Sequence, residues 1–365
     1  MIIYFALLVL LCLYKIKLKP DESGFQSDYM SVEKTTAIKG IFIVIVFFSH
    51  FKNYVDLNSI WAADAKFYEY FSLIGQRMVT PFLFFSGYGV MESISRKGMN
   101  YVHSIPRKRF LHVLAEFDIA IVIFTVVRII LKTPFNNGKM FDIKQFLLSL
   151  VGWDSVGNSN WYIFSILVAY AATFIAFEIF REKKYLSVIG VTVLLSLFII
   201  CFRFFDVKEP YWYNTVICYA GGMWFSLLRP AVEKILMKNT VWIPVFILST
   251  ALCLYSFKFA HINFVLYEIS MCLFVWAIVV FTMKVSICSK PLVWLGKNLF
   301  PMYIFQRLPM IVFRYLGLSD YNIYLYFAVC FAATVGISWL FSKFSKLLWT
   351  PKEKRTKIEK IKSER

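Results

Sequence analysis

The stretch IKGIFIVIVFFSHF, residues 38–51, decides the fold class because it is apolar along almost its whole length. A helix needs about 20 mostly apolar residues to cross the hydrocarbon of a bilayer. The rest of the chain has the same character: 59% of its 365 residues are hydrophobic, 17% are charged, and the mean hydropathy is +0.64. Soluble domains carry about 25% charged residues. The sequence therefore predicts an all-α, polytopic integral membrane bundle.

The apolar segments predict ten core spans and one extra N-terminal span. The N-terminal span has no positive region before it and no small-residue cleavage site after it, so it is interpreted as retained and not as a signal peptide. The predicted division is residues 1–37 for this span and a cytosolic linker, 38–349 for the membrane domain and 350–365 for a basic tail. The predicted spans are residues 2–18, 38–56, 77–96, 110–132, 160–180, 185–203, 213–229, 240–257, 263–283, 291–315 and 321–349.

The basic residues predict an orientation. With the N-terminus outside and the C-terminus in the cytosol, 28 of the 40 Lys and Arg residues fall in cytosolic segments, as the positive-inside rule requires. The net charge of +18 therefore indicates inner loops and contact with membrane lipids, and not a nucleic-acid partner. The longest outer loops are 57–76 and 133–159, and the apolar middle of the second suits a helix along the outer surface.

His50 is the most informative single residue. An ionisable side chain inside a membrane is costly and by default marks a function, although a hydrogen bond between helices is the competing explanation. Lys39 precedes His50 by eleven residues, which is about 16 Å along a helix. Lysines also flank the cytosolic ends of many spans. As a pair, a cation at the cytosolic mouth and a base deeper in match a long ligand with a phosphorylated head and a reactive tail, such as an acyl-CoA thioester.

Five motifs resemble those of the membrane acyltransferase-3 family, in the same order along the chain. AIKGIFIVIVFFSHF (37–51) is similar to its first core span, where a basic residue precedes a histidine by eleven positions. The others are VTPFLFFSGYGVME (79–92), PRKRFLHVLAEF (106–117), NSNWYIFSIL (158–167) and LVWLGKNLFPMYIF (292–305). Two positions differ from the family pattern. Where relatives have an Arg-x-x-Arg pair, this chain has Arg109 followed by His112, and Gln306 stands where many relatives have a histidine.

The resemblance implies an O-acyltransferase, most often an O-acetyltransferase, in a bacterial cytoplasmic membrane. Acyl-CoA would be a donor substrate and not a permanently bound cofactor, and the acceptor would be a cell-envelope or exported glycan or a lipid-linked sugar. Lys39 would hold donor phosphates together with the basic turn Arg107, Lys108 and Arg109. His50 would act as general base on the acceptor hydroxyl or carry the acyl group itself.

Further polar residues have both functional and structural explanations. Glu116 and Asp118 lie inside a predicted span and need partners, so one of them is a candidate to orient His50 or to pair with Arg109. Trp161 is either a sugar platform or part of an interfacial aromatic belt. Gln306 can hydrogen-bond a sugar but cannot act as a base.

The remaining features narrow the class of site. Arg307 and Arg314 either hold an anionic glycan or extend to the interface. The seven cysteines are scattered singly, without the spacing of a disulfide framework or a metal site. The rival interpretation is a non-acylating polysaccharide flippase or polymerase, which would share the spans and the basic inner loops. A polymerase would more often carry a large outer loop with paired arginines, and a flippase would need cations along a central path.

Overall fold

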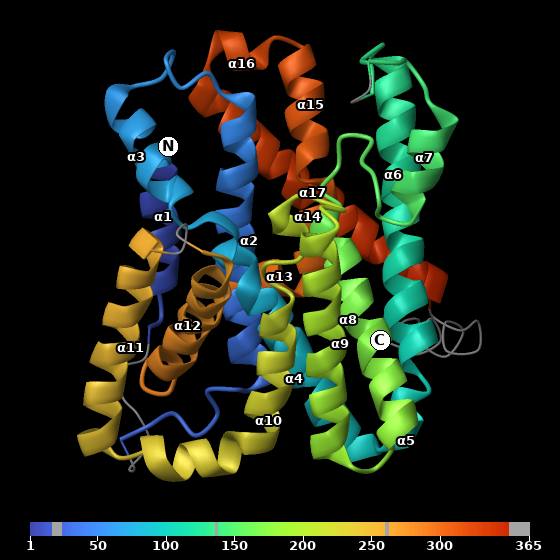
Figure 1. Cartoon of the computed structure of the whole chain (residues 1–365). Coiled ribbons are helices and arrows are strands. Elements are labelled where there is room, and N and C mark those ends of the chain that lie inside the picture. Colours follow the sequence, from blue (N-terminus) through green and yellow to red (C-terminus); the bar gives the residue numbers. More distant parts are fainter. Residues whose placement is uncertain (17–23, 136–137, 260–262, 350–365) are drawn as a thin grey trace, which may run out of the picture.

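The computed structural model describes residues 1–16, 24–135, 138–259 and 263–349, and these residues form a helical bundle (Figure 1). The all-α prediction is confirmed. The helices are α1 (Ile2–Leu13), α2 (Val32–Phe51), α3 (Ala62–Ser72), α4 (Thr80–Lys97), α5 (Met99–Val102), α6 (His112–Ile130), α7 (Ile143–Leu150), α8 (Trp161–Phe180), α9 (Lys184–Phe204), α10 (Ile217–Leu236), α11 (Asn239–Phe259), α12 (Phe264–Thr282), α13 (Lys290–Lys297), α14 (Leu299–Phe305), α15 (Arg307–Tyr315), α16 (Leu318–Tyr321) and α17 (Ile323–Trp349). Shorter turns of helix are η1 (Lys52–Tyr54), η2 (Gly75–Val79), η3 (Pro106–Leu111) and η4 (Pro210–Trp212).

Five helices within the described ranges are long and apolar enough to cross a membrane. They are Trp161–Phe180, Lys184–Phe204, Asn239–Lys258, Phe264–Thr282 and Ile323–Trp349. Several apolar helices of this kind are typical of a multi-pass membrane protein. Helices α2, α4, α6 and α10 carry charged residues that line a cavity inside the bundle, which lowers their mean hydropathy. The predicted total of ten core spans is therefore not confirmed by length and composition, and it stays a prediction.

The predicted span 291–315 is not one continuous helix, because this segment is three short helices, α13, α14 and α15. The breaks fall at Asn298 and Gln306, each three residues before a proline. Pro301 and Pro309 have no N–H to donate to the carbonyl four residues earlier, and each ring would clash with that carbonyl. Each proline therefore lies near the start of a new helix. Asn298 stabilises its break by donating to the Trp294 carbonyl (2.8 Å) and accepting from Ser342 on α17 (2.6 Å).

The helix containing Lys39 and His50 starts earlier than predicted. It begins at Val32, six residues before the predicted boundary at 38, and it ends at Phe51. Ser31 caps its N-terminus by accepting from the Lys34 N–H, and Glu33 lies in the first turn, where the helix dipole favours an acidic residue. Hydrophobicity alone misses this start because residues 32–37 include charged and hydroxyl side chains.

Two glycine pairs let helices cross at backbone contact. A Cβ on Gly222 of α10 would lie 2.0 Å from the Phe84 carbonyl oxygen of α4, and a Cβ on Gly87 of α4 would lie 2.0 Å from the Tyr219 carbonyl oxygen of α10. Gly40 of α2 and Gly296 of α13 meet in the same reciprocal way. Small residues at such crossings are the usual means of close helix association in membranes.

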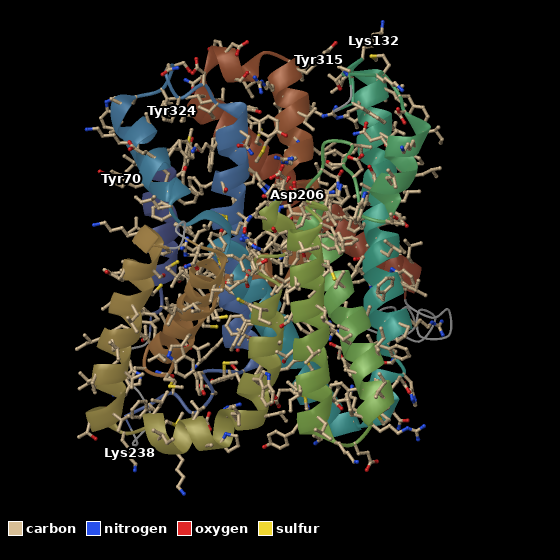
Figure 2. All side chains as sticks on the ribbon, in the orientation of Figure 1. Tyr70, Lys132, Asp206, Lys238, Tyr315 and Tyr324 are labelled. Carbon is tan, nitrogen blue, oxygen red and sulfur yellow. The ribbon has the colours of Figure 1, made fainter. Side chains whose placement is uncertain are left out.

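Residues beside two of the predicted outer loops lie at one end of the bundle and a residue of a predicted cytosolic loop at the other, whereas Asp206, in a third predicted outer loop, lies between them (Figure 2). Figure 2 shows Lys132 and Tyr315 at one end and Lys238 at the other. Between them, α2 begins toward the Lys238 end and ends toward the Lys132 end (Figure 1). The helix in the predicted outer loop 133–159 is present as α7, which Asp142 caps through the Gln145 N–H at 3.0 Å.

Candidate functional site

Helix α2 brings Lys39 and His50 onto one of its faces. Eleven residues at about 100° each make three turns plus about 20°, so the two side chains are nearly aligned along the helix. Both are half-buried. The Gly40–Gly296 contact holds this part of α2 against α13. Lys39 and His50 are therefore two polar groups on the same face of α2, separated along the helix axis.

A large basic cavity opens at the Lys39 end of α2. It has a volume of about 810 Å³, and six Lys or Arg residues line it against three acidic ones. Lys39, Lys108 and Arg109 of the predicted donor site are among them, whereas Arg107 is exposed and does not line the cavity. The six cations are Lys39, Arg96, Lys108, Arg109, Arg229 and Lys297. An excess of positive charge in a cavity of this size suits a phosphorylated ligand.

Arg109 is positioned by the π-helical turn η3, which begins at Pro106 and projects the basic side chains at a helix entrance. Its Nε donates to the Tyr101 hydroxyl at 3.0 Å. Arg109 and Lys39 lie close enough to repel each other. Two like charges held together in the interior favour an anionic ligand between them.

Glu116 also lines the basic cavity, on α6. It accepts a hydrogen bond from Ser345 of α17, and its Oε1 lies 3.6 Å from His112 Nδ1. The His112 ring in turn stacks on Trp349, with centroids 4.7 Å apart. The structure thus joins Glu116 to α17. Within the described part of the chain, neither Glu116 nor Asp118 contacts His50 or Arg109, so the expected pairing of these groups is not found.

A second, polar cavity is lined by His50, which does not line the basic one. Its volume is about 550 Å³, and its walls come from α2, η2, the loop 155–160 and α15. Trp161 and Arg307, both candidates from the sequence, line it. Trp161 packs edge-on against Tyr211 with centroids 6.0 Å apart. Hydroxyls, amides and aromatic faces in one cavity are the groups that sugars bind.

His50 lies in the wall of the polar cavity, with Ser159 as its hydrogen-bond partner. The Ser159 Oγ is 3.3 Å from His50 Nδ1. When Nδ1–H donates to Ser159, Nε2 carries the free lone pair and can accept a proton. Gln306 is fully buried beside the imidazole and donates to the Tyr303 carbonyl at 3.0 Å; it does not line the cavity. The groups that orient His50 are therefore the Ser159 hydroxyl and the Gln306 amide, and not the carboxylates Glu116 or Asp118 that the sequence offered as candidates.

Tyr303 of α14 lines both cavities. Its ring lies 6.1 Å from the His50 ring and 5.1 Å from the Tyr162 ring, centroid to centroid. Helix α14, which follows the break at Asn298, carries this tyrosine into the wall between the two cavities. A ligand tail from the basic cavity and a hydroxyl in the polar cavity would therefore meet at Tyr303 and His50.

Sequence reasoning missed several members of this site. Arg96, Arg229 and Lys297 were counted only as cytosolic anchors, yet they line the basic cavity. Ser159 and Tyr303 belong to the quoted motifs, but no spacing rule pairs either of them with His50, because Ser159 is 109 residues away along the chain. Over the described ranges there is no group of three His, Cys, Asp or Glu residues suited to a metal ion.

Fold and site together define a class: a helical membrane protein with a basic cavity and a polar cavity that share Tyr303 in their walls, and with a half-buried histidine lining the polar one. A family model described as an acyltransferase domain (Acyl_transf_3) matches residues 35–343, most of the chain. The chain therefore belongs to the acyltransferase-3 family, as the motifs predicted. Comparisons with curated proteins and with solved structures gave no match.

Proposed function

We propose that this protein is a membrane-embedded O-acyltransferase, most simply an O-acetyltransferase, that moves an acyl group from acyl-CoA to a hydroxyl of a cell-envelope or exported glycan. The observation that supports this proposal best is that Tyr303 lines both cavities, with the ring of His50, which lines the polar cavity, 6.1 Å from its own ring. Membership of the acyltransferase-3 family supports the transferase class over a flippase or polymerase.

The donor enters the basic cavity from the cytosol in this proposal. Lys39, Lys108 and Arg109 bind its phosphates, and the basic cavity also offers Arg96 and Lys297. The pantetheine arm then extends along the α2 wall toward His50, a path of about 16 Å from Lys39. The thioester carbonyl lies beside Tyr303 at the end of this path.

The acceptor hydroxyl approaches from the polar cavity. His50 Nε2 takes the hydroxyl proton while the acceptor oxygen attacks the thioester carbonyl, and Ser159 holds the imidazole through Nδ1. The new carbon–oxygen bond forms and the carbon–sulfur bond breaks. The imidazolium then returns the proton to the departing thiolate of CoA, so His50 ends neutral. Proton, acyl group and leaving group therefore balance with His50 alone as base and acid.

The sidedness of the two cavities follows the predicted orientation. The N-terminus is outside and the C-terminus is in the cytosol in this proposal, so the basic cavity opens inward and the polar cavity opens outward. Donor and acceptor then come from opposite sides of the bacterial cytoplasmic membrane and exchange the acyl group through the bundle.

The proposal is tested by the acetyl content of the host's surface glycan with and without the gene. We expect O-acetyl signals in the proton NMR spectrum of the wild-type glycan, loss of those signals on deletion, and recovery when the wild-type chain is supplied. When purified protein is mixed with acetyl-labelled acetyl-CoA and the extracted glycan, the labelled acetyl group should move to the glycan. Unchanged acetyl signals on deletion would instead support the rival, a protein that moves or extends the glycan.

A further inference from the structure

Three arginines lie in or near the polar cavity. Arg307 of α15 lines the cavity. Tyr54 of η1 lies within the electrostatic reach of Arg128, Arg307 and Arg314, and Arg128 and Arg307 are close enough to repel each other. Figure 2 shows Lys132 and Tyr315, which follow Arg128 and Arg314 in the chain, at the same end of the bundle. The three residues are called the outer arginine cluster below.

No carboxylate balances this cluster in the parts of the chain that the structure describes, since every ion pair found there involves other residues. Arg128 Nη1 donates to the Pro134 carbonyl, but its Nε is buried without a hydrogen-bond partner. The Nε of Arg307 is buried and unpartnered as well, and so is the Nδ2 of Asn158, another residue that lines the cavity. The cluster and the cavity wall beside it therefore hold buried donor atoms that have no hydrogen-bond partner.

Extension of these side chains to the interface does not account for the geometry. An arginine that extends to the interface places its guanidinium in water, where hydration satisfies its donors. Arg314 is exposed, but one donor atom each of Arg128 and Arg307 is buried, and these two like charges are held within reach of each other, which is unfavourable unless an anion joins them. An oxyanion would accept from several of these donors at once through charge-assisted hydrogen bonds.

Gly157 holds Arg128 against the loop that carries Ser159. A Cβ on Gly157 would lie 2.7 Å from Arg128 Nη2 and 2.8 Å from its Nε, so the guanidinium packs directly against this glycine and would have to shift for a larger residue. The φ of Gly157 is +108°, a conformation that other residues rarely adopt. The loop therefore places Arg128 beside the residues that orient His50, on the acceptor side of the site.

We propose that the acceptor is anionic, and that the outer arginine cluster binds a phosphate or carboxylate of the glycan or of its lipid carrier while a neighbouring hydroxyl reaches His50. This inference rests on the proposed function, because it names the substrate class of that same polar cavity. The shared chemistry is an oxyanion. Its source is either a uronate within the glycan or the diphosphate of a lipid-linked sugar.

Binding is tested without acyl transfer, on full-length protein in nanodiscs of zwitterionic phosphatidylcholine. The probes are a neutral glucose tetramer, a glucuronate tetramer and a short-prenyl diphosphoryl sugar, with quenching of tryptophan fluorescence as the signal, since Trp161 lines the cavity. We expect at least one anionic probe to bind about tenfold or more tightly than the neutral tetramer, and this preference to weaken as salt is raised. The probe that shows the preference identifies the source of the oxyanion.

Variants test whether the preference for anionic probes depends on the outer arginine cluster. Arg128→Gln with Arg307→Gln should remove it, by about tenfold or more, whereas Arg128→Lys with Arg307→Lys should keep part of it because the charge remains. Arg203→Gln is the matched control, since Arg203 lies over the Phe264 ring at 4.5 Å and does not line the cavity. It should bind like the wild type.

Two results would overturn the inference: equal binding of neutral and anionic probes by the wild-type protein, or an unchanged preference in the folded double Gln variant. The first needs no variant, so a folding failure of the double Gln protein leaves the test intact. Failure of the proposed function is distinguishable, because a chain that binds oxyanions here without transferring acetyl would fail only the glycan NMR test.

Discussion

Gly222→Ala should destabilise the bundle, and Gly221→Ala, one residue earlier in α10, should not. The added Cβ at 222 would lie 2.0 Å from the Phe84 carbonyl oxygen and 2.9 Å from the Tyr88 nitrogen, whereas a Cβ at 221 would meet its nearest atom, Phe84 Cδ2, at 3.9 Å. Since both neighbours are backbone atoms of α4, α10 must move away by more than about 1 Å to restore ordinary contact distances.

The magnitude follows from the comparison of neighbouring variants. Overpacking a well-packed contact costs about 1–3 kcal/mol. The gain from replacing a helical glycine with alanine, about 0.5–1 kcal/mol, is common to both variants and cancels in their difference. We therefore expect Gly222→Ala to be about 1–3 kcal/mol less stable than Gly221→Ala, which is roughly a fivefold to hundredfold change in the unfolding equilibrium constant.

Thiol labelling in a denaturant titration measures this difference, because Cys218 of α10, Cys253 and Cys330 are free and buried and become reactive only on opening. In Gly222→Ala, the movement of α10 away from α4 should also widen the basic cavity, since Arg96 of α4 and Arg229 of α10 both line it. Equal stability of the two variants, within about 0.5 kcal/mol, would refute the close crossing of α4 and α10.

Two further predictions concern the donor site and the topology. Lys39→Gln should raise the KM for acyl-CoA about tenfold in steady-state assays while Lys39→Arg stays near wild type, because phosphate binding here depends on charge; Arg107→Gln, an exposed cation outside the cavity, is the matched control and should change little. An equal effect of Lys39→Gln and Arg107→Gln would remove Lys39 from the donor site. A cysteine at Ser155 should react with an impermeant thiol reagent in intact cells, and labelling only after lysis would reverse the proposed orientation and the route of the donor.

The fold class could be predicted because it depends on composition, which the sequence states directly. The helix interruptions at Asn298 and Gln306 could not be read from hydropathy, since residues 291–315 are apolar throughout most of their length. The prolines at 301 and 309 carried the missing information, because a proline early in a helix indicates that the previous helix has ended. A sequence reading that gave these two residues more weight than hydropathy would have found both breaks.

The site was predicted where its residues share one helix and was missed where they come from several. Lys39 and His50 lie on a single face of α2, so their spacing alone relates them. Ser159 reaches His50 from a loop 109 residues away, whereas the candidates that the sequence offered were Glu116 and Asp118, because carboxylates inside a span need partners. Such a contact depends on tertiary packing. Tertiary packing also decides that Lys108 lines the basic cavity and that its neighbour Arg107 does not.

The most direct test of the account is acyl transfer by purified, folded His50→Gln protein. Glutamine keeps approximate size and a hydrogen-bond partner for Ser159 but cannot take the acceptor proton. We expect the transfer rate to fall by about 10²–10⁴-fold, the usual contribution of a general base, while acyl-CoA still binds with wild-type affinity. Transfer at a near wild-type rate by this variant would contradict the mechanism and leave His50 as a structural contact between α2 and the loop that carries Ser159.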